Sequence, residues 1–131
     1  MDFSSLVLME KDSKTKYFIK ELGSYEVGDG AEFITKLFCE DNMVNLYFST
    51  VRDTEEWEFT AIYDEFNEEV FEKKGFKIVS VDDEYNPTWL IKFDYDEEYE
   101  IIKNQINHIC TVILEEMERV FQAIKGKEDQ Y

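Results

Sequence analysis

The single histidine, His108, and the two cysteines, Cys39 and Cys110, are the side chains here best suited to nucleophilic catalysis. At about 100° per residue of a helix, His108 lies about 200° from Ile106 and points away from the apolar stripe that carries Cys110. A cysteine and a histidine on different sides of one helix do not form a catalytic pair. We therefore expect His108 to be exposed, Cys110 to be a small buried hydrophobe, and the chain not to be an enzyme.

Carboxylates form a dense run where a strand is expected to lead into the last helix. Asp94, Asp96 and Glu97, followed by Glu98 and Glu100, offer oxygen ligands for a hard cation or acids for glycoside hydrolysis. The run lacks the glycine and the ligand spacing of an EF-hand loop. Acids at a helix start also complement the positive end of the helix dipole, so we expect Asp94 or Asp96 to cap the helix and keep a metal site as the alternative.

The glycine-rich stretch at residues 23–30 is not a phosphate-binding loop. It contains Glu26 and Asp29, and no Gly-Lys-Ser or Gly-Lys-Thr sequence follows it. Two acids inside a loop would repel a phosphate group. We therefore expect no nucleotide and no cofactor.

The composition is that of an acidic folded domain. The 131 residues include 31 acids and 14 Lys or Arg, which gives a net charge of −17, and 44% of them are hydrophobic. We expect one domain over residues 1–126 and a frayed tail at 127–131. The negative charge argues against direct binding of nucleic acid or of anionic membrane surfaces.

The compartment is inferred from the N-terminus and the cysteines. Asp2 stands where a secretion signal would carry a basic residue, and the next apolar run ends at Glu10. Two cysteines in a chain long enough to build a core are more typical of reduced thiols than of a disulfide framework. Both features predict a cytoplasmic protein.

Alternating apolar and polar residues fill the first two thirds of the chain, which is typical of strands. Residues 23–31, with three glycines, are expected to form a loop, and residues 66–72 a short middle helix that Lys73, Lys74 and Gly75 terminate. Three hairpins are expected, and their strands are 6–9 with 17–22, 32–39 with 43–50, and 76–81 with 89–95. A further single strand is expected at 57–63.

The clearest element is a helix from about Asp96 to Lys125. Apolar residues recur there at intervals of three and four, and Gly126 supplies a stop signal. Strands first and a long helix last predict an α+β fold, with an antiparallel sheet of about six to seven strands, a short middle helix, and a long C-terminal helix packed on the sheet in two layers.

No motif assigns the chain to a family by specific residues. The succession of antiparallel strands, a short helix, two further strands and a long final helix resembles small bacterial secretion-chaperone and adaptor domains in its topology. That resemblance implies an adaptor or chaperone-like protein and transfers no functional residue.

Two layers leave the second face of the sheet open, yet apolar residues occur on both faces of some strands. Ile34, Phe38 and Tyr47 are expected on the second face, and Ile101 and Val112 lie outside the main helical stripe. Either the middle helix covers that face, or a partner or second subunit does. These five residues are the candidate contacts for a protein partner or a homodimer.

Three functions remain open at this point. The first is a non-catalytic protein-binding or adaptor domain that presents its acidic surface to a partner with a basic surface. The second is a polyanion mimic, in which carboxylates replace the phosphates of nucleic acid and inhibit a basic protein. The third is a carboxylate-dependent metal-binding protein or hydrolase.

The distribution of acids predicts how stability depends on salt. Residues 53–100 hold 17 acids and four lysines, which leaves only −4 of the −17 to the rest of the chain. Because salt screens charges over about 8 to 10 Å at ordinary ionic strength, self-repulsion should weaken on its addition. We expect the melting temperature, followed by circular dichroism, to rise between low and about 0.15 M NaCl. A flat or falling melting temperature would show that these acids are already paired locally.

Overall fold

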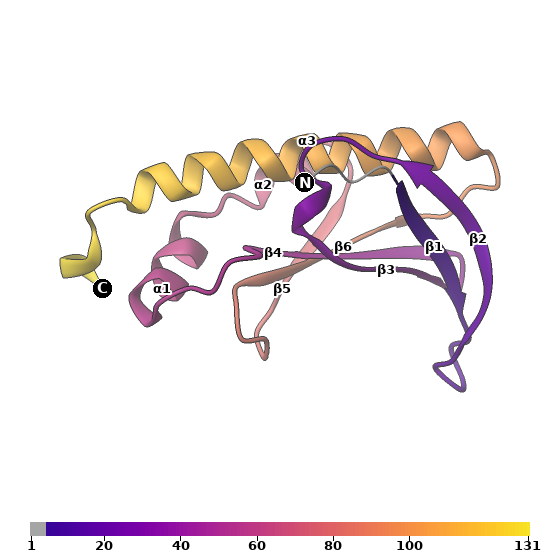
Figure 1. The fold of residues 1–131 in the computed structure, drawn as a ribbon, viewed down its shortest axis with the longest axis horizontal. Coiled ribbons are helices and arrows are strands. Elements are labelled where there is room, and N and C mark those ends of the chain that lie inside the picture. Colours follow the sequence, from indigo (N-terminus) through magenta and orange to yellow (C-terminus); the bar gives the residue numbers. More distant parts are fainter. Residues whose placement is uncertain (1–4) are drawn as a thin grey trace.

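The fold is a six-stranded, mostly antiparallel sheet with a long C-terminal helix packed across one face (Figure 1). The structure, a computed structural model, describes residues 5–131. The strands are β1 (Ser5–Lys11), β2 (Phe18–Glu26), β3 (Ile34–Glu40), β4 (Met43–Ser49), β5 (Lys77–Val81) and β6 (Thr88–Asp94). The helices are α1 (Glu56–Glu65), α2 (Glu69–Glu72) and α3 (Tyr99–Ile124).

The strand order across the sheet is β2-β1-β3-β4-β6-β5. Neighbouring strands are antiparallel except β1 and β3, which run parallel and pair Met9 with Phe38 and Glu10 with Cys39. The three expected hairpins are β1 with β2, β3 with β4, and β5 with β6. The α+β class and the two-layer arrangement are thus confirmed.

Helix α3 supplies the apolar face that the sheet needs. Its buried side chains recur at three and four residues and meet the inward side chains of β1, β3, β4 and β6. Gly126, at φ 76°, ends the helix as expected. The α3 residues that are at most 2% exposed are Ile102, Ile106, Ile109, Cys110, Ile113, Met117, Val120 and Ile124.

The expected strand at 57–63 is wrong, because this segment forms helix α1. The alternation of Trp57, Phe59, Ala61 and Tyr63 suits a strand, but residues four apart also share a face of a helix. Phe59 and Tyr63 do so, with ring centroids 5.1 Å apart. At the helix start the Glu55 N–H donates to the Glu58 carboxylate at 2.9 Å, an N-terminal capping interaction that the strand interpretation overlooked.

The expected loop at 23–31 and strand at 32–39 have different bounds in the structure. Strand β2 continues to Glu26, because Gly23 and Tyr25 pair with Leu8 and Leu6 of β1. A 3-10 turn occupies Ala31–Phe33, so β3 begins at Ile34. The pairing of β2 with β1 therefore overrides the local glycine signal.

The middle helix is present but bent into α1 and α2. The Asn67 side chain accepts a hydrogen bond from the Glu69 N–H at 3.1 Å, and Gly75, at φ 90°, follows the end of α2. At the other end of the chain, residues 128–130 form a 3-10 turn, and Lys127 Nζ lies 3.6 Å from a Glu65 carboxylate oxygen. Fraying of residues 127–131 stays a prediction.

Gly30 marks the point where the β2–β3 connection touches α3. Its φ is 101°, and a Cβ added there would lie 2.1 Å from the carbonyl oxygen of Cys110. We expect Gly30→Ala to lower the free energy of unfolding by at least about 2 kcal/mol, because backbone strain adds to the steric clash. Urea denaturation checks this. Gly28→Ala is the matched control, because nothing lies within 4 Å of its added Cβ; equal losses for both variants would contradict the close approach.

Candidate binding surface

Helix α3 runs along one face of the sheet (Figure 1), and Ala61 and Ile62 of α1 and Phe71 of α2 belong to the same core. Phe66 and Phe71, from the bent middle segment, pack against Phe48 of β4, with ring centroids 6.0 and 5.7 Å apart. Phe48 belongs to the face that carries the core, together with Val44 and Leu46. The middle helix therefore does not cover the second face, and of the two alternatives only cover by a partner or a second subunit remains.

The bent segment is held against α3 by a buried carboxylate. Glu116 is 5% exposed, and its side chain accepts hydrogen bonds from the Asn67 N–H at 2.8 Å and from Arg119 at 2.7 Å. Arg119 also donates to the Glu65 carbonyl oxygen. These contacts fix the α1–α2 junction on the helix layer, away from the second face.

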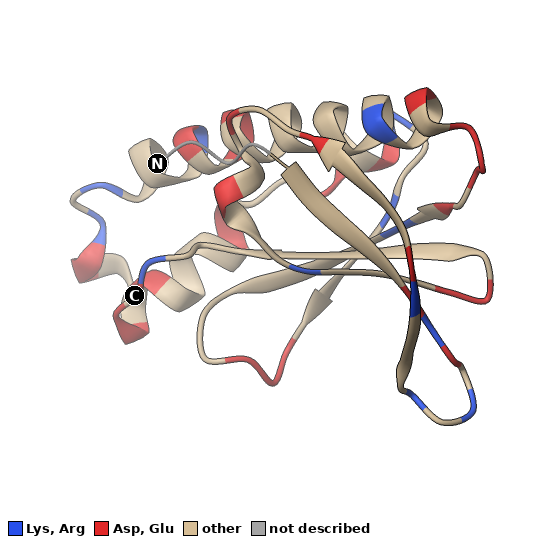
Figure 2. Ribbon diagram, turned by 45° about the vertical axis from the view of Figure 1, so that its right-hand side comes forward, with Lys and Arg blue, Asp and Glu red and all other residues tan. Residues whose placement is uncertain are grey.

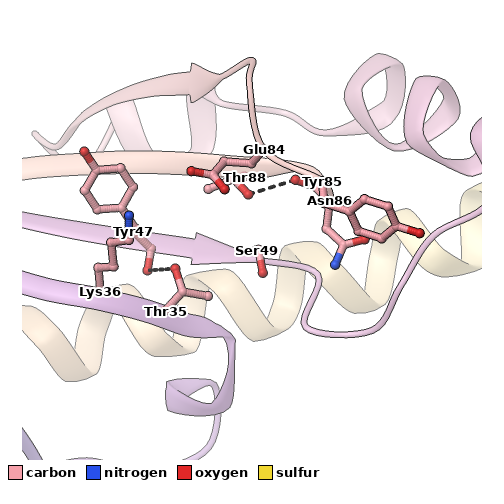
Figure 3. Close-up of a pocket in the computed structure, with 8 residues that line it drawn as sticks. All are labelled: Thr35, Lys36, Tyr47, Ser49, Glu84, Tyr85, Asn86 and Thr88. Atoms are coloured by element: carbon pink, nitrogen blue, oxygen red, sulfur yellow. Dashed lines mark hydrogen bonds between the residues drawn. The ribbon is translucent and has the colours of Figure 1, made fainter.

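The face of the sheet that points away from α3 is called the open face below. It contains a shallow depression of about 760 Å³ that crosses β3, β4, β6 and β5. A smaller hollow of about 190 Å³ adjoins it, where the Lys36 and Tyr47 side chains lie side by side (Figure 3). The open face comprises Met9, Lys11, Lys36, Phe38, Glu40, Met43, Asn45, Tyr47, Lys77, Val79, Leu90, Lys92 and Asp94.

Strand register arranges these side chains in rows, because residues paired across neighbouring strands project to the same side of the sheet. One row is Phe38, Asn45, Lys92 and Lys77 on β3, β4, β6 and β5. The next row is Lys36, Tyr47, Leu90 and Val79 on the same four strands. Apolar and aromatic groups thus occupy the middle of the open face, with lysines on both sides and the acids Glu40 and Asp94 in the row of Met43.

An aromatic pair forms the centre of this surface. The rings of Phe38 and Tyr47 stack with centroids 6.2 Å apart, and Phe18 meets Phe38 edge-on at 6.3 Å. Lys11 Nζ lies 4.5 Å from the Phe38 centroid, and Lys36 Nζ lies 5.3 Å from that of Tyr47. Cation–π attraction therefore holds two lysines over the aromatic pair.

The structure brings together only two of the five partner-contact candidates. Phe38 and Tyr47 meet on the open face, but a register shift at the start of β3 turns Ile34 toward the core, contrary to expectation. Val112 is only 6% exposed, because the segment that docks on Glu116 runs along the same side of α3. Ile101 is 37% exposed on α3, in the layer behind the sheet.

The acid run before α3 does not form a converging site. Asp94, Asp96 and Glu97 are all exposed, and in residues 5–131 no three His, Cys, Asp or Glu side chains converge to hold a metal ion. The expected cap is wrong, because α3 begins at Tyr99 and Glu98 occupies the N-cap position. The Asp96 carboxylate instead accepts the Glu98 N–H at 2.8 Å and shapes the turn that enters the helix.

The thiols and the histidine lie apart from the open face. Cys39 and Cys110 are free and buried, and burial raises the pKa of Cys39 and raises that of Cys110 to about 12. Both thiols are therefore protonated at neutral pH and resemble small hydrophobes. His108 is exposed on α3, with its ring 6.0 Å from that of Phe76.

Charge is distributed differently on the two sides. Acids of residues 53–100 are spread over α1, α2, the β5–β6 turn and the approach to α3 (Figure 2). Sequence reasoning missed the lysines of the open face, although Lys77 and Lys92 each occupy a strand position between two apolar neighbours. Only the strand order reveals that these distant lysines are neighbours.

Within residues 5–131, no helix is long and apolar enough to cross a bilayer.

Lys77 and Lys92 lie directly opposite each other on β5 and β6. Because like charges in this position repel, Lys77→Glu should raise the free energy of unfolding by about 0.2 to 1 kcal/mol through attraction to Lys92. Lys77→Gln removes the repulsion alone and should lie between the parent and Lys77→Glu. Urea midpoints at low salt check the order, and a lower midpoint for Lys77→Glu would contradict the register.

The comparisons with known proteins place the chain in a family without assigning it an activity. Among curated proteins and solved structures, none matches the chain. The sequence model of one protein family, described as a family of unknown function (DUF6762), matches residues 1–131. The match covers the entire sequence, and the chain therefore belongs to the DUF6762 family.

Proposed function

We propose that this chain is a non-catalytic protein-binding domain, of the adaptor or chaperone-like kind, whose partner lies on the open face of the sheet. The observation that carries the proposal is the apolar and aromatic centre of a face that the chain's own helices leave uncovered. An antiparallel sheet with one solvated face is normally polar on that side. Apolar groups there favour a binding role.

The apolar surface continues past the open face to Tyr17 and to the first residues of the edge strand β2. Tyr17, Phe18 and Ile19 are 73%, 58% and 59% exposed, and the Phe18 ring contacts that of Phe38. Across the sheet, Val79 of the other edge strand is 56% exposed. A partner laid across the strands would remove this apolar area from water, which is the main source of binding free energy in protein association.

The remaining chemistry supports binding better than catalysis. The thiols are buried and protonated, and the histidine is exposed on the far layer. The depressions on the sheet are shallow surfaces, whereas enzyme pockets enclose most of a small substrate. Two free buried thiols also fit our proposal that the protein acts in the cytoplasm.

Site-specific photocrosslinking in the source organism tests the proposed function. A benzoylphenylalanine at position 47, in the centre of the open face, should give a covalent adduct of discrete mass with one protein. The matched control is position 104, because Asn104 is exposed on α3 behind the sheet. Adducts of equal yield at both positions, or none at position 47, would overturn the proposal, and an adduct of twice the chain mass would identify the partner as a second copy.

A further inference from the structure

The open face is close to neutral in a molecule that is strongly acidic. Within residues 5–131, its four lysines are matched by four acids that project from it or line its hollows, and these are Glu40, Asp41, Glu84 and Asp94. On the β1–β2 side, Lys16 and Glu21 add one charge of each sign. This leaves 26 of the 31 acids and nine of the 14 Lys or Arg to the rest of the chain. The open face therefore lets two copies of the chain approach with little net repulsion.

Opposite charges lie in separate rows of this face. Glu40 and Asp94 share one row, and Lys36 lies two rows further along the strands. A two-fold axis that lies in the plane of the face, along the middle row of Asn45, exchanges the two outer rows. Glu40 of one copy then lies over Lys36 of the partner subunit, and the symmetry makes this contact twice. The face thus carries both halves of an ion pair that only a second copy completes in this way.

The same symmetry matches the apolar groups. Met43, in the row of the acids, comes over Tyr47 of the partner subunit, and a thioether beside an aromatic ring is a favourable contact. Lys77 and Lys92 lie toward the β5 edge and are exposed, so their stems can pack while their ammonium groups stay in water. Asp94 lines the same hollow as both lysines and offsets part of their charge.

The face is large enough for a stable contact between two copies. From β2 to β5 the sheet spans five strand intervals, or about 24 Å, and its seven-residue strands are about 23 Å long. The footprint is therefore about 550 Å², and side chains make the accessible area larger than the footprint. A standard interface removes about 800 Å² of accessible surface from each partner. The exposed Tyr17, Phe18 and Ile19 extend the apolar area beyond the strands.

Face-to-face packing also keeps the acidic helix layers apart. The acids of residues 53–100 lie mostly on α1, α2 and the approach to α3 (Figure 2). Two sheets pack about 10 Å apart and a helix is about 10 Å wide, so the α3 layers of two such copies are about 30 Å apart. At about 0.15 M salt the Debye length is about 8 Å. Repulsion between the helix layers is therefore largely screened.

We propose that the partner on the open face is a second copy of this chain, and that the two sheets pack face to face about a two-fold axis with both α3 helices outside. The row of Glu40 in each copy lies over the row of Lys36 in the other. This inference rests on the proposed function and names the partner. The acids of the helix layers stay in water on the outer faces of the dimer.

Sedimentation equilibrium of the full chain tests the dimer. At about 10 µM protein and about 0.15 M NaCl we expect a mass of twice 15.7 kDa. Val79 is 56% exposed on the open face, and Val79→Glu should weaken dimerisation at least about tenfold, because the symmetry buries the new charge twice. Ile101→Glu is the matched control on α3 behind the sheet and should leave dimerisation within about twofold. A monomer mass for the parent chain, or equal losses for the two variants, would overturn the proposal.

An exchange of charges tests the alignment of the rows. Lys36→Glu and Glu40→Lys each place like charges opposite each other in the dimer, so each variant alone should dimerise at least about tenfold more weakly than the parent. An equimolar mixture of the two variants should recover the dimer, because the exchanged side chains attract each other across the interface. Such recovery would also exclude unfolding as the cause of the losses. A mixture that dimerises no better than the separate variants would overturn the proposed packing.

The two proposals fail in distinguishable ways. A monomer in solution, together with a discrete adduct between position 47 and a different protein, would overturn the dimer and leave the protein-binding function standing. A dimer that depends on Val79, with no adduct at position 47, would contradict the proposed cellular function. Absence of both the dimer and the adduct would overturn both proposals.

Discussion

The docking of α3 on one face of the sheet is the contact on which the rest of this structure depends. Eight of its side chains, from Ile102 to Ile124, are at most 2% exposed and form the core with Phe48, Trp89 and Ile91. Burial of each large aliphatic side chain is worth about 1.5 to 3 kcal/mol before the entropy cost of ordering the chain. No other element of residues 5–131 supplies a comparable apolar surface.

Other contacts follow from the position of this helix. Asn107 of α3 donates to the Glu26 carbonyl oxygen at 2.8 Å and accepts the Gly28 N–H at 3.1 Å, which ties down the β2–β3 connection. About one turn beyond it, Gly30 and Cys110 come into close backbone contact. Further along α3, the Glu116 carboxylate accepts a hydrogen bond from the Asn67 N–H and fixes the position of the middle helices. The helix thus organises both the loop before β3 and the segment after β4 on one side of the sheet.

The same arrangement leaves the open face without internal cover. Two of its lysines, Lys11 and Lys36, are held near aromatic rings by cation–π contacts, and the acids Glu40 and Asp94 share the face with them. A cross-strand lysine pair and a stacked pair of aromatic rings beside solvent are features that stability alone does not explain. Sites that sacrifice some stability are where binding is most readily found.

The sequence by itself determined the fold class, the three hairpins and the long helix, because these features depend on periodicity, which is local information. It failed at 57–63, where four alternating apolar residues fit either a strand or a helix, and at Gly23 to Glu26, where pairing with β1 overrides a loop signal. It also misplaced Ile34 and Val112, whose burial depends on a register shift and on the docking of the 67–76 segment. Only tertiary structure decided that Lys36, Lys77 and Lys92 are neighbours of Phe38 and Tyr47, because the order β3-β4-β6-β5 joins residues that lie up to 56 positions apart in the chain.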